Sequence, residues 1–285
     1  MSEIPIVSLP TGGSFDLEQT LNSGQVFHWE AHRHAGTDGF AACIGDAPVS
    51  WIGQTGAEEI VTFERDKEKV LRYLGLDHDY SEIRATFPEG DEFLEKSIAY
   101  CPGIRIIRQP TWECLATFIT SSLKQVAHIR AISLTIRERY GNRYELDGKS
   151  YYSYPDPSAM SVAGEEALRK CALGYRAKSL DLAANSIASG ETDIEAIEQL
   201  EDPDEARELL TKLHGVGDKI ANCVLLFGCG HWGTFPIDVW IERVLRTQYR
   251  KRIKGAKLQA WAVKHFGPNA GCAQQYLFHF ARKTL

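Results

Sequence analysis

The sequence predicts an α+β protein in which an N-terminal antiparallel β-sheet with helices precedes an all-helical region. In the first hundred residues, short β-branched and aromatic runs alternate with Gly, Asp and Pro turns. From about residue 98, apolar residues recur at helical spacing up to the end of the chain. Two glycines, Gly215 and Gly217, interrupt this spacing, which then resumes at once. We therefore expect two domains, 1–97 and 98–285.

The N-terminal region is expected to hold a sheet followed by short helices. The predicted strands are Val26–Ala31, Phe40–Ile44, Val49–Ile52 and Ile60–Phe63. A helix is predicted over Asp66–Leu74, and Ser81 is expected to cap another.

The helical region is expected to begin with two long helices, Thr111–Ser122 and Gln125–Tyr140. The stretch Tyr144–Pro157 is rich in Tyr, Ser, Pro and Asp, which indicates a loop between helices.

Composition restricts the class of protein. The chain has 285 residues, of which 44% are hydrophobic and 25% charged, as in ordinary soluble proteins. No apolar run approaches the roughly 18 residues of a membrane span, and the first five residues do not resemble a signal peptide. We therefore expect a cytoplasmic protein that does not bind membranes. The seven cysteines are scattered, so we expect reduced thiols, no metal and no iron–sulfur cluster.

Charge is distributed unevenly along the chain. The net charge of −6 disfavours nucleic acid as a partner, but residues from 241 onward carry ten Lys and Arg against the single anion Glu242. DNA binding depends on the local field rather than on the total charge. The C-terminal region therefore favours a DNA-binding surface, and the alternative is a basic surface that is merely solvated.

The segment Leu213–Ala221 predicts a helix, a tight glycine hairpin and a second helix. Ile220, Cys223, Val224 and Phe227 follow the spacing of one buried helical face. Glycine lets backbone N–H groups point outward beside a helix N-terminus, a geometry that suits a phosphate. Lys219 follows the second glycine by two residues. Asp238 lies nineteen residues later, where it is placed to cap another helix.

These residues resemble a known family. Gly-Val-Gly-x-Lys followed by Pro-x-Asp-Val is similar to the helix-hairpin-helix DNA glycosylases with the Gly/Pro-Asp signature, and among them to the 8-oxoguanine DNA glycosylase/AP lyases. Three further segments carry the resemblance: Ser-Gly-Gln-x-Phe-x-Trp at 23–29, Leu-Gly-Tyr-Arg-Ala at 173–177, and Gln-x-x-Leu-Phe at 274–278. The resemblance implies a TBP-like N-terminal sheet domain followed by a helix-hairpin-helix glycosylase domain. It also implies excision of 8-oxoguanine from duplex DNA by base flipping and Schiff-base chemistry.

The resemblance implies two catalytic residues. Lys219 would attack C1′ of the sugar, and only the unprotonated amine can do so, which requires burial. Asp238 would stabilise the developing positive charge and assist proton transfers. The alternatives are a phosphate-binding lysine and a simple helix cap.

Four residues are implied for the pocket of the damaged base. The carbonyl of Gly24 would accept a hydrogen bond from N7–H, a group that ordinary guanine lacks. Gln274 would bind the Watson–Crick edge, while Phe278 and Cys223 would face the two sides of the ring. The alternatives are a turn glycine at 24 and an ordinary helix core at 278.

The remaining site residues are expected to contact DNA. The resemblance implies that Tyr175 wedges into the duplex and that Arg176 contacts the orphan base. The alternative is a core tyrosine beside a solvated arginine. His128 stands where many relatives carry an arginine, and Leu123 replaces an asparagine, so a preference for cytosine opposite the lesion is not implied. The predicted DNA-contacting set is Gly215, Gly217, Tyr175, Arg176, His128, Gln125 and Trp240.

The expected partner is double-stranded DNA containing oxidised guanine, bound by a monomer without a cofactor. The location would be the cytoplasm of a bacterium or the nucleus of a eukaryote. Two alternatives remain: a glycosylase for another damaged purine, and a non-catalytic helix-hairpin-helix DNA-binding protein.

Overall fold

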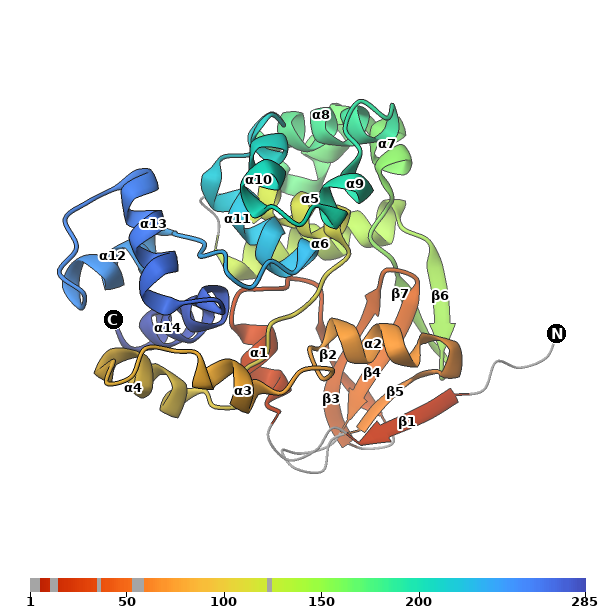
Figure 1. The fold of residues 1–285 in the computed structure, drawn as a ribbon. Helices are drawn as coiled ribbons and strands as arrows, with labels where there is room; N and C mark the ends of the chain where they lie inside the picture. Colours follow the sequence, from red (N-terminus) through yellow and green to blue (C-terminus); the bar gives the residue numbers. More distant parts are fainter. Residues whose placement is uncertain (1–5, 11–14, 35–36, 53–58, 122–124) are drawn as a thin grey trace.

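A five-stranded antiparallel sheet forms one side of the molecule (Figure 1). The computed structural model describes residues 6–10, 15–34, 37–52, 59–121 and 125–285. The strand order is β1-β5-β4-β3-β2, and every neighbouring pair is antiparallel, which confirms the predicted sheet. The strands are β1 (Ile6–Pro10), β2 (Glu30–His34), β3 (Thr37–Ile44), β4 (Ala47–Ile52) and β5 (Glu59–Phe63).

The strand predicted at Val26–Ala31 was wrong in its position, because β2 begins only at Glu30. Residues 26–29 are buried but irregular. Val26 and Trp29 pack into the core beneath the sheet, whereas Phe27 packs into the helical core. The apolar side chains of this segment therefore pack into two different cores, and such a run of β-branched and aromatic residues does not form a strand here.

Fourteen α-helices make up most of the described residues. They are α1 (Leu17–Asn22), α2 (Lys67–Tyr73), α3 (Tyr80–Ala85), α4 (Glu92–Tyr100), α5 (Thr111–Ser121), α6 (Val126–Tyr140), α7 (Pro157–Leu168), α8 (Arg176–Ala188), α9 (Ile194–Gln199), α10 (Pro203–Thr211), α11 (Asp218–Val224), α12 (Val239–Thr247), α13 (Gly255–Phe266) and α14 (Ala270–Thr284). A π-helical turn, η3 (Leu225–Cys229), extends α11. None of these helices is long and apolar enough to cross a membrane.

The stretch predicted as a loop, Tyr144–Pro157, instead contains a β-hairpin. Strands β6 (Arg143–Leu146) and β7 (Lys149–Tyr152) are joined by Asp147 and Gly148, with φ of 50° and 72°. Two positive φ angles in a two-residue loop match the twist of the flanking strands. The hairpin packs on the main sheet, where the hydroxyls of Tyr151 and Ser50 lie 2.6 Å apart.

Two hydrophobic cores stabilise the protein. One lies between the sheet and helices α1 and α2, and the larger one joins the helices from α3 to α14. Helix α4 packs along α14, although about 170 residues separate them (Figure 1). The division into 1–97 and 98–285 stays a prediction, since Phe87 and Leu94 contribute to the helical core.

A buried charge network connects the sheet to the helices. Arg137 on α6 pairs with Glu113 on α5, and its Nη1 donates to the carbonyl oxygens of Cys43 and Tyr152, both at 3.1 Å. His28 Nδ1 lies 3.3 Å from the Glu113 carboxylate. Burial lowers the pKa of His28 well below its ordinary value, with Arg137 adding to the effect. The network therefore consists of one carboxylate, one guanidinium and a neutral imidazole.

Candidate active site

The glycine hairpin places α11 directly after α10. Gly215 adopts φ +81°, and the amide of Val216 donates to the carbonyl of Leu213 at 3.1 Å. A methyl carbon at Gly215 would stand 2.4 Å from Oγ of Ser179 on α8, so the turn requires a residue without a side chain. Gly217 is exposed and forms the N-cap of α11. The predicted helix–hairpin–helix is thus present, with exposed backbone at its tip.

Lys219 points inward from the first turn of α11. Its Nζ lies 4.9 Å from the centre of the Phe118 ring, and Phe118 is buried in α5. The residue itself is half-buried. Cys223, one turn further along α11, is buried, and burial raises the pKa of its thiol to about 11 against the opposing influence of the Lys219 ammonium. The amine and the thiol are therefore close neighbours within the protein.

Asp238 caps α12 and is held by the backbone. Its Oδ1 accepts hydrogen bonds from the amides of Trp240 at 3.0 Å and Ile241 at 2.9 Å. Burial raises the pKa of the Asp238 carboxyl, while these two bonds and the nearby cations Lys219 and Arg282 oppose the rise. The same carboxylate also raises the pKa of the Cys223 thiol. Lys219 and Asp238 thus influence one another electrostatically, and both influence the pKa of the Cys223 thiol.

Three of the four residues predicted for the base pocket, Gly24, Gln274 and Phe278, come from the two ends of the chain. Gly24 has φ +83°, and a methyl carbon there would stand 3.0 Å from Cε1 of Phe278 and 2.9 Å from Nη1 of Arg282. Gln274 on α14 is buried, and its Oε1 has no hydrogen-bond partner. The structure therefore brings Gly24 against Phe278 and leaves a free acceptor one helical turn away.

The Ser23–Gln25 turn is fixed by side chains that the sequence did not indicate. Gln275 Nε2 donates to the carbonyl oxygen of Ser23 at 2.9 Å. Gln25 Nε2 donates to Oγ of Ser23 and to the carbonyl of Arg105, and its Oε1 accepts from the amide of Ile107. The backbone of Gly24 is thus held at a fixed position relative to α14.

Tyr175 and Arg176, two of the residues predicted to contact DNA, lie at the start of α8 and differ in exposure. Tyr175 is 61% exposed at the start of α8, after Gly174 with φ +63°. Arg176 is buried, and its guanidinium lies 4.3 Å from the Tyr175 ring centre. In this conformation the Arg176 guanidinium therefore packs against the Tyr175 ring. A side chain that wedges into the duplex must be exposed to solvent in the free protein, and the Tyr175 side chain is exposed.

The other predicted DNA contacts lie on α6 and α12. Gln125 and His128 are exposed in the first turn of α6. Trp240 is half-buried at the start of α12, with the Arg243 guanidinium 5.0 Å from its ring centre. Leu123 lies outside the described residues.

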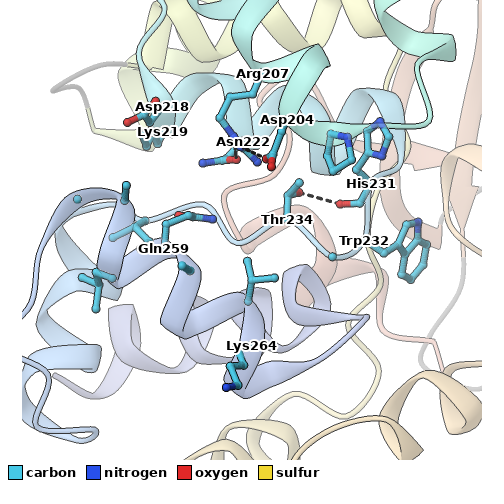
Figure 2. Close-up of a pocket in the computed structure, with 18 of the residues that line it drawn as sticks. Asp204, Arg207, Asp218, Lys219, Asn222, His231, Trp232, Thr234, Gln259 and Lys264 are labelled. Carbon is cyan, nitrogen blue, oxygen red and sulfur yellow. Dashed lines mark hydrogen bonds and ion pairs between the residues drawn. The ribbon is translucent and has the colours of Figure 1, made fainter.

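A large cleft adjoins the hairpin (Figure 2). It has a volume of about 1400 Å³ and lies between α10 and α11 on one side and α13 on the other. Lys219 and Asp218 lie across it from Gln259 and Lys264. Its described lining does not include Gly24, Cys223, Gln274 or Phe278. The cleft is therefore distinct from the predicted base pocket, and Lys219 lies beside both. No cluster of metal-ligating side chains occurs among the described residues.

Comparisons with known proteins show the family to which the chain belongs. A family model described as the 8-oxoguanine DNA glycosylase N-terminal domain matches residues 8–115. The structure of MBOgg1 in complex with a low affinity DNA ligand is 32% identical, with 98% of this chain and 96% of that chain covered at a TM-score of 0.89. The Clostridium acetobutylicum 8-oxoguanine glycosylase/lyase, bound to double-stranded DNA with cytosine opposite 8-oxoG, is 30% identical, with 95% of this chain and 93% of that chain covered at a TM-score of 0.86.

A sequence relative gives the same result over the whole chain. The probable N-glycosylase/DNA lyase of Methanothermobacter thermautotrophicus is 28% identical over 300 residues, covering 95% of each protein. Fold and site together define a helix-hairpin-helix DNA glycosylase with lyase activity. The chain belongs to the 8-oxoguanine DNA glycosylase family. This confirms the family resemblance and the fold class, while the roles of individual site residues remain predictions.

Proposed function

We propose that this protein excises 8-oxoguanine from duplex DNA and then cleaves the strand at the abasic site. The observation that carries the proposal is that the Lys219 amine lies 4.9 Å from the centre of the buried Phe118 ring, while two backbone amides hold the Asp238 carboxylate, which interacts electrostatically with Lys219. An amine and a carboxylate held in place are the two groups that this reaction requires.

In the proposed reaction, the lone pair of the unprotonated Lys219 Nζ forms a bond to C1′. The C1′–N9 bond breaks, and its electron pair leaves with the base. The nitrogen now bonded to C1′ loses one proton, and its lone pair forms a C1′=N bond as the C1′–O4′ bond breaks and O4′ takes up a proton. The resulting protonated imine makes a C2′ proton acidic, and loss of that proton expels the 3′ phosphate with the electron pair of the C3′–O bond. Asp238 stabilises the positive charge on the sugar while the base departs. Its two backbone hydrogen bonds fix the carboxylate without side-chain motion.

The base pocket supports oxidised guanine as the substrate. The carbonyl of Gly24 would accept from N7–H, and it would repel the lone pair that ordinary guanine carries there. The unpaired Oε1 of Gln274 offers an acceptor to the N1–H and N2–H donors of the Watson–Crick edge. The exposed glycines of the hairpin and the basic residues from 241 onward would bind the DNA backbone. We further propose that the protein acts as a monomer wherever its DNA lies, in a bacterial cytoplasm or a eukaryotic nucleus.

Single-turnover cleavage of a panel of duplexes tests this function. The panel carries 8-oxoguanine, other damaged purines and ordinary guanine, each opposite all four bases. The expected result is release of 8-oxoguanine at least about 100-fold faster than release of guanine. Faster release of another damaged purine would favour the alternative substrate. Equal binding of every duplex without cleavage would favour a non-catalytic DNA-binding protein.

A further inference from the structure

Arg282 is a member of the base pocket that the sequence did not indicate. It lies on the last turns of α14, four residues after Phe278, and its guanidinium carbon is 5.3 Å from the centre of the Phe278 ring. Its Nη1 is the atom nearest to the position that a methyl carbon at Gly24 would occupy, at 2.9 Å. Arg282 therefore lies beside the two residues expected to face the lesion.

The guanidinium of Arg282 has an unused donor within the protein. Nη1 is buried and has no hydrogen-bond partner. A buried donor without an acceptor is unfavourable, and a guanidinium remains protonated under ordinary conditions. Asp238 favours the charged form, because its carboxylate opposes the lowering of the Arg282 pKa by burial. Nη1 is thus a charged donor that is available to an incoming ligand.

The chemistry of the proposed substrate supplies an acceptor at this place. In 8-oxoguanine, N7 is flanked by two carbonyl oxygens, O6 and O8. If the Gly24 carbonyl accepts from N7–H, a donor next to Gly24 faces one of these oxygens. We propose that Arg282 is a specificity-determining residue whose Nη1 donates a hydrogen bond to a carbonyl oxygen beside N7 of the extruded base. This inference rests on the proposed function.

An alternative role for Arg282 is to support Asp238 without touching the base. The two roles predict different effects on the two reactions of the protein. A bond to the base matters while the base is present, whereas support of Asp238 also matters for strand cleavage at an abasic site. A preformed abasic duplex contains no base. It therefore separates a residue that touches the substrate from a residue that positions the carboxylate.

The test compares Arg282→Met with Arg282→Lys and with the control Lys96→Met. Lys96 is exposed on α4, outside the basic region from 241 onward, so its substitution removes one positive charge away from the proposed DNA-binding surface. We expect Arg282→Met to slow release of 8-oxoguanine by about tenfold or more. Strand cleavage of the abasic duplex should change by no more than about twofold. Arg282→Lys should recover part of the loss, because it keeps the charge but not the planar fork.

Urea unfolding of each variant establishes that it is folded. Equal loss in both reactions by folded Arg282→Met or Arg282→Lys, or no loss in either reaction, would overturn the inference. Wild-type protein that fails to release 8-oxoguanine would instead contradict the proposed function. Normal wild-type release with an unaffected Arg282→Met variant would contradict only the role of Arg282.

Discussion

The side-chain amide of Gln275 donates a hydrogen bond to the carbonyl oxygen of Ser23 at 2.9 Å, across 252 residues of sequence. Both groups are buried. The bond ties the turn that carries Gly24 to the helix that carries Gln274 and Phe278. Gln275 thus fixes the position of Gly24 relative to Gln274 and Phe278, although Gln275 is not itself expected to face the base.

Substitution of Gln275 by Leu should both destabilise the protein and impair excision. The Ser23 carbonyl would lose its partner in a buried position, which costs about 1–3 kcal/mol of unfolding free energy. Urea unfolding monitored by fluorescence measures this loss. Gln248→Leu, on the exposed end of α12, serves as the control. An unfolding free energy equal to that of the wild type would show that the bond does not hold the turn.

Gly24→Ala should reduce lesion discrimination more than DNA affinity. The added methyl carbon would meet Phe278 and Arg282 at 3.0 and 2.9 Å, and φ +83° is strained for alanine. We expect the ratio of 8-oxoguanine release to guanine release to fall by about tenfold or more. The affinity for undamaged duplex, measured by anisotropy, should remain within about twofold of wild type. Equal losses in discrimination and affinity would count against a role for Gly24 in recognising N7.

The sequence predicted what depends on local signals and missed what depends on distant contacts. The positions of Lys219 and Asp238 are marked within a few residues by a glycine pair and a helix cap, whereas their catalytic roles are implied by the family resemblance and stay predictions. Gln275 and Arg282 come close to the Ser23–Gly24 turn only in the folded protein, when α14 packs against that turn. No local sequence pattern therefore indicates their roles. The β6–β7 hairpin was missed for another reason. Asp147-Gly148 is a strong two-residue turn signal, but the Tyr, Ser, Pro and Asp residues around it are typical of a loop.

Substitution of Glu113 by Gln should strongly destabilise the fold. The Arg137 guanidinium would remain buried without its carboxylate, and breaking such a pair costs about 3–5 kcal/mol. Urea unfolding again provides the measurement. The double variant Glu113→Gln/Arg137→Met should be more stable than the single variant, because it removes the uncompensated charge. An unfolding free energy of Glu113→Gln within about 1 kcal/mol of the wild-type value would show that the Glu113–Arg137 pair is not needed for stability.

Asp238→Asn should abolish most glycosylase activity without unfolding the protein. Asparagine keeps an oxygen for the amides of Trp240 and Ile241, so the unfolding free energy should change by less than about 1 kcal/mol. The rate of base release should fall about 100-fold.

The pH dependence of Asp238 gives a second readout. Burial raises the pKa of this carboxyl, so it becomes neutral at a higher pH than an ordinary aspartate. Wild-type base release should therefore decline as the pH falls through that raised pKa, and Asp238→Asn should lack this decline. The same acid limb in both proteins would assign it to another group.

Borohydride trapping on a duplex containing 8-oxoguanine tests the role of Lys219 most directly. Reduction of the imine would leave the wild-type protein joined covalently to DNA, as a slower band on a denaturing gel. Lys212→Gln, an exposed lysine before the hairpin, should give the same band. Lys219→Gln should bind the duplex but give no band. An adduct of wild-type intensity with Lys219→Gln would show that another amine attacks the sugar.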